Sequence, residues 1–280
     1  QLERFWGRFD VLHDSIPTGE RELSEGLVLD MIFSERYVPA MTTRSLLAII
    51  LVSSVGFVAC QTPVPHRNPE EAYGQLNTIV FGGDTVLARR MNPFVEEHGP
   101  EKALAGVAEV MREADITIVN LECIVAGDGE MADKGERNPY FFRGRPELVR
   151  VLTTAGVDVA SLANNHGGDY GPDAIADGME ILRNAGIEPV GAGGDVNEAM
   201  APVFRKVGDT VVAFIAMDMT QHKVGATATR GGPHFISESD PNAVVERVRE
   251  QVRLARRYAH LVFFVTHWGR NYDEEPNDVH

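Results

Sequence analysis

The sequence predicts an α/β fold with a largely parallel β-sheet, and two observations support this prediction. Short apolar runs rich in Val and Ile alternate along the chain with segments whose apolar residues recur at helical spacing. Gly and Pro stand at many of the boundaries between these segments. Strands that alternate with helices usually pair in parallel, so we expect several strands to share one carboxyl edge, where ligands bind in such sheets.

The elements follow from these patterns in chain order. A helix over residues 146–155 begins with Pro and is followed by Gly156, which is typical of helix ends. A second predicted helix, over residues 172–185, is amphipathic and is followed by Gly186. Gly208-Asp209 lies between two apolar runs and predicts a hairpin turn. The predicted strands cover residues 78–81, 116–119, 157–163, 187–190, 203–207, 210–217 and 261–266, and the helices 100–114, 146–155, 172–185, 197–201 and 241–260.

Composition limits the function. The formal net charge of −15 argues against nucleic acid as a partner, because binding to phosphates requires clustered Lys and Arg. The same charge disfavours a polyanionic ligand unless a metal ion or a local basic patch intervenes. The chain has only two cysteines, Cys60 and Cys123, so no disulfide framework is implied. We expect Cys123 to be a small buried residue and not a nucleophile.

The first 76 residues have the pattern of an export signal that follows a non-native upstream segment. Residues 1–40 show no sustained helical or alternating pattern and are predicted to be that upstream segment. Residues 41–60 contain a basic start and an uncharged apolar run, as in a signal peptide. Residues 61–76 are rich in Pro and polar residues and predict a tether. This order predicts an extracytoplasmic protein.

The predicted signal peptide ends in Val58-Ala59-Cys60, which resembles a lipobox whose cysteine becomes lipidated. Phe57 departs from that pattern, because Leu usually stands there. Lipidation at Cys60 would anchor the domain to a membrane. An ordinary signal peptide that is cleaved nearby, giving a secreted or periplasmic protein, and an uncleaved anchor are the alternatives.

Four predicted strands are each followed by residues that can bind a metal ion. These residues are Asp84, Glu122, Asn165 with His166, and His267. Taken singly, such a residue is more often a turn, a helix cap or a solvated side chain. Together, at one sheet edge, the mixed oxygen and imidazole donors suit one or more divalent cations. A pair of such ions can stabilise both oxygens of a phosphoryl transfer.

These motifs, in this order, resemble the CapA family (PGA_cap) of poly-γ-glutamate capsule synthesis and, more distantly, the calcineurin-like metallophosphoesterases. The resemblance covers residues 77–280 and implies a metallophosphoesterase-like layered sandwich of two β-sheets flanked by helices. The matching motifs are Gly83-Asp84, Asn120-Leu121-Glu122, Phe142-Arg143 with Pro146-Glu147, Ala163-Asn164-Asn165-His166, Asp169-Tyr170-Gly171, Gly191-Ala192-Gly193 with Glu198-Ala199, and His267-Trp268-Gly269.

The resemblance assigns roles to individual residues. It implies that Asp84, Glu122, Asn165 and His267 are metal ligands, and that His166 is the acid or oxyanion-stabilising residue. Asn164 is expected to be only a structural neighbour.

Two further residues have competing interpretations. Arg143 is a candidate for binding an anionic substrate, and a surface arginine at a helix entry is the equally weighted alternative. Asp169 would orient His166, although capping the helix that begins near Pro172 is the more common role for such a residue. His222 and His234 lie in an irregular segment and are expected to be exposed loop residues.

Three positions depart from the family pattern. Val86 stands where the first metallophosphoesterase motif has His, and Asn271 stands where the family has Glu after His-Trp-Gly. The late Gly-His-x-His motif does not occur, so the domain over residues 77–280 is predicted to be truncated at its C-terminus.

These observations predict a surface-tethered protein of poly-γ-glutamate capsule synthesis or export, with a divalent-metal hydrolase-type site and an anionic polymer or phosphoester as substrate. Two alternatives remain open. One is a non-catalytic scaffold that anchors a membrane synthase complex, which Val86 would suit. The other is a general extracytoplasmic phosphoesterase. Fold alone does not distinguish these functions.

Overall fold

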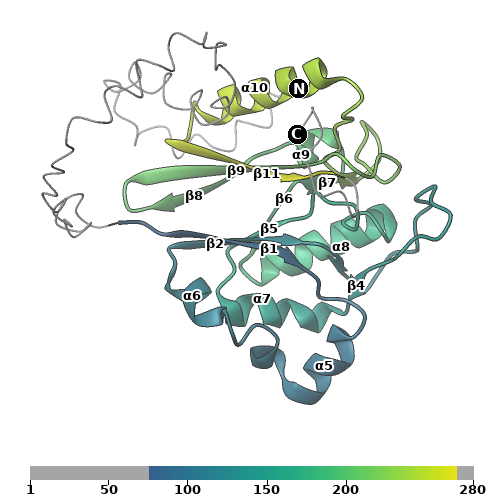
Figure 1. Ribbon diagram of the computed structural model, residues 1–280, viewed down its shortest axis with the longest axis vertical. Helices are drawn as coiled ribbons and strands as arrows, with labels where there is room; N and C mark the ends of the chain where they lie inside the picture. Colours follow the sequence, from purple (N-terminus) through teal and green to yellow (C-terminus); the bar gives the residue numbers. More distant parts are fainter. Residues whose placement is uncertain (1–75, 270–280) are drawn as a thin grey trace, which may run out of the picture. The chain divides into compact units, whose positions relative to one another are not determined.

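The structure, a computed structural model, describes residues 76–269 (Figure 1). Two main β-sheets pack face to face within this range, and helices cover the outer face of each, which confirms the predicted layered α/β sandwich. The predicted upstream segment, the signal peptide with Cys60 and all of the tether except Leu76 lie outside the described residues. None of the helices within 76–269 is both long enough and apolar enough to span a bilayer.

The first sheet is entirely parallel, as predicted, with the strand order β1-β2-β5-β6. Its strands are β1 (Ile79–Thr85), β2 (Ile116–Leu121), β5 (Val159–Ser161) and β6 (Glu188–Val190). Parallel pairing places the ends of β1, β2 and β5 at one edge, and Asp84 lies opposite Asn120 there. β1 and β2 run further than predicted, so Asp84 is part of its strand.

The second sheet has the order β11-β9-β8. β8 (Val203–Val207) and β9 (Thr210–Asp218) form the predicted antiparallel hairpin, in which Gly208 adopts a φ of 55°. β11 (Leu261–His267) runs parallel to β9 and ends with His267 opposite Asp218. Two short strand pairs form separate sheets: β3 (Ile124–Val125) with β4 (Arg143–Gly144), and β7 (Ala192–Gly193) with β10 (Gly232–Pro233).

One predicted helix is wrong in extent. The segment 100–114 forms only the short turn η2 (Pro100–Lys102) and α6 (Ala108–Glu113), with turns between them where Gly106 disfavours a helix. α5 (Met91–His98) was not predicted. The other helices lie close to the predicted positions: η3 (Pro146–Leu148) leading into α7 (Val149–Ala155), α8 (Gly171–Asn184), α9 (Val196–Ala199) and α10 (Pro241–Ala255).

Alternating residues of β9 form two separate apolar layers. Val211, Ala213 and Ile215 pack against Ala255 of α10, which lies over the outer face of this sheet in Figure 1. The residues between them, Val212, Phe214 and Ala216, pack against the first sheet. A strand with two apolar faces is expected when it is buried on both sides.

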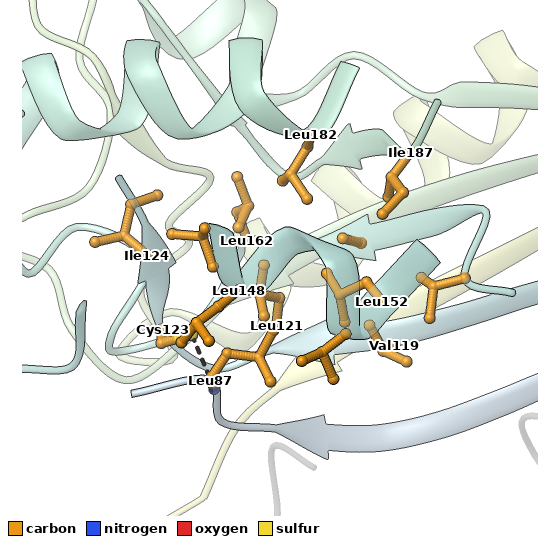
Figure 2. Packing of buried hydrophobic residues seen from close by; sticks show 14 of the residues in the cluster. Leu87, Val119, Leu121, Cys123, Ile124, Leu148, Leu152, Leu162, Leu182 and Ile187 are labelled. Carbon is orange, nitrogen blue, oxygen red and sulfur yellow. Dashed lines mark hydrogen bonds between the residues drawn. The ribbon is translucent and has the colours of Figure 1, made fainter. Parts of the chain in front are cut away.

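The largest apolar cluster lies between the first sheet and helices α7 and α8 (Figure 2). Cys123 is buried in this cluster, where its Sγ accepts a hydrogen bond from the Leu87 amide at 3.3 Å. Burial raises the pKa of the Cys123 thiol to about 12, so the thiolate is disfavoured. The prediction that Cys123 is a buried structural residue is confirmed.

The prediction of an exposed loop histidine is correct for His222 and wrong for His234. His234 is 1% exposed, and its Nδ1 lies 2.7 Å from the carbonyl oxygen of Ala216. Burial lowers the pKa of His234 to about 4, against the opposing effect of that hydrogen bond. A segment without regular secondary structure can still be buried when its polar groups are paired, as they are here.

Candidate functional site

Three of the four predicted metal ligands lie together. Asp84 comes from the end of β1, Glu122 follows β2, and His267 ends β11. One ligand atom from each residue lies within 4.8 Å of the others. We call these three residues the acid–histidine cluster. Both sheets contribute to it, so neither sheet alone could form it.

Two glycines bring Asp84 into position. The pairing of β1 with β2 is irregular between Phe81 and Asp84, where Gly82 and Gly83 lie. Gly83 has a φ of 65°, which favours glycine. A Cβ atom on Gly82 would lie 2.9 Å from Cγ1 of Val119, so a side chain there would clash with the Val119 side chain unless that side chain moved. This local irregularity sets the position of Asp84 at the end of the strand.

Asn120 connects the cluster to the loop that carries His166. Its Nδ2 donates to Oδ1 of Asp84 at 2.7 Å and lies 3.3 Å from Nδ1 of His267. Its Oδ1 accepts a hydrogen bond from Nδ2 of Asn164 at 3.0 Å. Hydrogen-bonded neighbours of this kind orient metal ligands. No role was predicted for Asn120, although an amide in a mostly apolar, buried strand is a signal.

Negative charge accumulates in the cluster. Burial, and then the nearby carboxylate of Asp84, raise the pKa of Glu122, while His267 acts in the opposite direction. Across residues 76–269, no Lys or Arg forms an ion pair with Asp84 or Glu122; the closest basic atom is Nε2 of His267, 3.8 Å from Oε1 of Glu122. A bound cation would relieve this repulsion.

Asn165, the fourth predicted ligand, has an unsatisfied acceptor. Its Oδ1 is buried, and it has no hydrogen-bond partner among the described residues. An unpaired buried carbonyl oxygen costs free energy, which makes such an atom a candidate for an additional ligand or ion. The two carboxylates and the imidazole of the acid–histidine cluster are donors that fit a divalent cation.

His166 is buried, and its ring contacts Phe142 and Asp169. Its side chain stacks on the ring of Phe142, with centroids 4.0 Å apart and an interplanar angle of 22°. Its Nδ1 lies 2.7 Å from Oδ2 of Asp169, and the residue is 6% exposed. Because a carboxylate can only accept, Nδ1 carries the proton, and Nε2 is the ring atom available for chemistry.

Asp169 is held from three sides. Besides His166, it accepts hydrogen bonds from Nζ of Lys134 and from the backbone amide of Phe142, each at 2.7 Å. The side chains of Lys134 and Asp169 are 1% and 0% exposed, so this is a buried ion pair. We call His166, Asp169 and Lys134 the buried triad. Nothing in the sequence singled out Lys134, because its partner lies 35 residues away.

The geometry decides between the two interpretations of Asp169. The N-cap of α8 is Tyr170, and no side chain caps this helix. Helix capping, the more common role for such a residue, is therefore wrong for Asp169. Its carboxylate contacts the His166 ring, as a residue that orients the histidine would.

Arg143 is occupied by contacts that hold the chain together. Its Nη1 donates to the carbonyl of Gly129 at 3.1 Å, and its Cζ lies 4.2 Å from the ring centre of Tyr170. It is partly buried in β4, so it is not the surface arginine at a helix entry that formed the alternative. Its predicted role in binding an anionic substrate stays a prediction.

Comparisons with known proteins agree on one family. Residues 78–280 match the family "Bacterial capsule synthesis protein PGA_cap". The chain is 27% identical over 235 residues to the capsule biosynthesis protein CapA of Bacillus anthracis, covering 83% of this chain and 55% of that protein. It is 27% identical over 201 residues to the PGA biosynthesis protein CapA of Bacillus subtilis, covering 71% and 50%.

A third relative is a "Probable polyglutamine synthesis accessory protein" of Mycobacterium tuberculosis. It is 33% identical over 172 residues, which cover 59% of this chain and 44% of that protein. The chain thus spans about half the length of the curated relatives it matches.

Proposed function

Because this chain belongs to the PGA_cap family of bacterial capsule synthesis proteins, we propose that it acts in the synthesis or export of a poly-γ-glutamate capsule through a metal-dependent, hydrolase-type site. The observation that supports a metal-dependent site is the convergence of Asp84, Glu122 and His267 within 4.8 Å. Two carboxylates that have no Lys or Arg partner among residues 76–269 are the environment that a divalent cation stabilises.

In this proposal Asp84, Glu122 and His267 hold the ion, and the Oδ1 atom of Asn165 serves as a neutral ligand. Asn120 keeps the carboxylate of Asp84 and the ring of His267 in place through its amide. A divalent ion at such a site polarises a phosphoryl or acyl oxygen and lowers the pKa of a coordinated water.

His166 supplies proton transfer in this proposal. Asp169 accepts the Nδ1 proton, so the ring is fixed in the orientation that leaves Nε2 for a proton given to the leaving group. The ring of Phe142 covers one face of the imidazole and limits its rotation. Lys134 balances the charge of Asp169, which allows that carboxylate to stay buried.

The substrate in this proposal is an anionic polymer or a phosphoester, and Arg143 is its sequence-predicted contact. The protein acts outside the cytoplasm, anchored through lipidated Cys60 and associated with a membrane synthase complex. Palmitate labelling of the full-length protein, with Cys60→Ser as the control, tests the anchor. Label that persists in Cys60→Ser would exclude this anchor.

Hydrolysis of a chromogenic phosphodiester, and of poly-γ-glutamate, by the full-length protein in the presence of Mn²⁺ tests the catalytic part. We expect His166→Asn to lower the rate by about 10²–10⁴-fold, because general acid–base catalysis typically contributes that much. Asn keeps a donor for Asp169 but lacks Nε2. His222→Asn, which changes an exposed histidine, is the matched control and should keep the wild-type rate.

The same assay distinguishes the proposal from a scaffold. A protein that binds Mn²⁺ but hydrolyses neither probe, and supports capsule formation in cells with His166→Asn, would overturn the hydrolytic role. That result would favour the non-catalytic anchor of a synthase. Hydrolysis of the phosphodiester alone would instead favour a general phosphoesterase.

A further inference from the structure

Arg89 has a backbone conformation that arginine rarely adopts. Its φ is 53°, and within residues 76–269 it is the one residue other than glycine with a positive φ. It lies in the turn between β1 and α5, a short distance along the chain from Asp84. A non-glycine residue in this region is strained, and such residues cluster at functional sites. A glycine at this position would relieve the strain but would remove the side chain, so the strain is accompanied by whatever the side chain contributes.

The guanidinium of Arg89 lies beside the aromatic residues that support His166. Its Cζ is 5.7 Å from the ring centre of Tyr140 and 5.7 Å from that of Phe142. Phe142 in turn stacks on His166, with centroids 4.0 Å apart. Arg89 is therefore one aromatic ring away from the proposed acid. The cation–π contacts hold the guanidinium near Phe142 without using its N–H groups in hydrogen bonds to an acceptor.

Arg89 differs from the other arginines near this loop in what it pairs with. Arg143 donates to the carbonyl of Gly129, and Arg145 pairs with Glu96 at 2.9 Å. Arg89 is exposed, and no carboxylate in the described part of the chain lies within ion-pair distance of it. Its planar fork of donors is the geometry that binds carboxylate and phosphate oxygens.

We propose that Arg89 binds an oxyanion group of the substrate, a carboxylate or a phosphate, next to His166. This inference rests on the proposed function and moves the anion contact from Arg143, whose guanidinium is already engaged, to Arg89. The role is one of substrate binding. A protein with a net charge of −15 needs a local cation to bind a polyanion, and Arg89 supplies one close to the proposed chemistry.

The test measures the binding of two anions to the full-length protein by calorimetry. The probes are a short γ-linked glutamate oligomer, which offers carboxylates, and inorganic phosphate. We expect Arg89→Gly to weaken the binding of at least one probe about 10–100-fold, because a hydrogen-bonded charge pair typically contributes that much. The probe that loses affinity identifies the oxyanion. Arg89→Lys keeps the charge but loses the planar arrangement of donors, so its affinity for the probe should lie between those of wild type and Arg89→Gly.

The same variant should be more stable than the wild type. Arg89→Gly removes the backbone strain, so we expect its melting temperature to rise by about 2–4 °C. Arg90→Ala is the matched control: this neighbouring arginine has a φ of −69° and makes no side-chain cap, so neither affinity nor melting temperature should change. Higher stability together with weaker binding would separate a substrate contact from a structural role.

Two results would overturn the inference: wild type that binds neither probe, or an Arg89→Gly protein that binds both as tightly as wild type. The inference and the proposed function fail separately. If Mn²⁺ binding and hydrolysis that depends on His166 persist while Arg89→Gly binds normally, only the role of Arg89 is wrong. If binding depends on Arg89 in a protein that binds no Mn²⁺, the metal-dependent function is wrong and the anion contact stands.

Discussion

The acid–histidine cluster and the buried triad differ in how the charges of their carboxylates are balanced. In the triad, the Asp169 carboxylate accepts hydrogen bonds from Lys134, His166 and a backbone amide, and almost none of its surface is exposed. In the cluster, Asp84 and Glu122 lie close together, and His267 is their only basic partner within residues 76–269. The charges of the triad are balanced by its own side chains, whereas no Lys or Arg among the described residues balances the carboxylates of the cluster.

The difference distinguishes the triad, whose charges are balanced by side chains, from the cluster, where we propose that a cation supplies the balancing charge. A buried ion pair satisfied by the chain fixes one arrangement of side chains, here the orientation of the His166 ring. When a cation binds two carboxylates that have no counterion, the free energy of binding adds to the stability of the folded protein. We therefore expect changes in the triad to affect folding, and changes in the cluster to affect metal binding.

Removing the cation of the triad should have the largest effect on stability. Lys134→Met leaves Asp169 buried without its counterion, which typically costs about 3–5 kcal/mol in the free energy of unfolding. Urea denaturation followed by circular dichroism measures this loss. The matched control is Lys223→Met, because Lys223 also pairs with an aspartate, Asp133, but at the surface. Similar stabilities for the two variants would contradict the assignment of the triad as a preassembled unit.

A smaller effect is expected from His234, a buried histidine that the protein satisfies in its neutral form. Its pKa falls from 6.5 to about 4 on folding, because burial disfavours the imidazolium. Because the pKa is lower in the folded protein, neutral His234 favours folding at a pH above its unfolded pKa. This stabilisation is lost as the pH falls from about 6.5 through about 4. The loss amounts to at most about 3 kcal/mol.

Denaturation of wild type and His234→Asn between pH 7 and pH 4 tests this prediction. Asn retains a donor for the carbonyl of Ala216 but does not titrate in this range, so the variant should lose less stability than wild type as the pH falls. His222→Asn, at an exposed histidine, should follow the wild-type curve. A His234→Asn curve parallel to that of the wild type would show that His234 is not buried in its neutral form.

Part of this arrangement could be predicted from the sequence. Strand ends, the turn at Gly208 and the end of α7 at Gly156 are local patterns, and the structure contains each of them. Because parallel strands share an edge, these patterns also placed Asp84 and Glu122 near one another. The same strand-end pattern included His267 but assigned it to that one edge; in the structure His267 ends β11 of the second sheet, and only the packing of the two sheets brings it to the cluster.

The remaining features depend on contacts between residues far apart in the sequence. Lys134 reaches Asp169 across 35 residues, and Asn120 reaches His267 across 147. No local pattern marks such partners, because a lysine in a polar loop is ordinarily solvated. The prediction that His234 is exposed was wrong for a related reason. The absence of regular secondary structure says little about burial, which depends on what packs over the segment. The exposed turn at Arg89 likewise became informative only once its φ and its aromatic neighbours were known.

The thermal stability of wild type and Glu122→Gln, with and without Mn²⁺, tests most directly whether the cluster binds a divalent cation. The pKa of Glu122 is raised on folding, so the protonated carboxyl favours folding at a pH below its unfolded pKa. This stabilisation is lost as the pH rises through the pKa of Glu122 in the folded protein. Near pH 7 and without metal, Glu122→Gln should therefore be at least as stable as wild type. Because Glu122 is only partly buried, solvent screening should keep this gain small.

Mn²⁺ at about 100 times its Kd should then stabilise wild type by about 2.7 kcal/mol, because it binds only the folded state, and should stabilise Glu122→Gln far less. Glu109→Gln, at an exposed acid of α6, should respond to Mn²⁺ as wild type does. Stabilisation by Mn²⁺ that depends on Glu122 but not on Glu109 is the result we predict. No shift of the wild-type melting temperature, or an equal shift in Glu122→Gln, would contradict a metal site at the cluster.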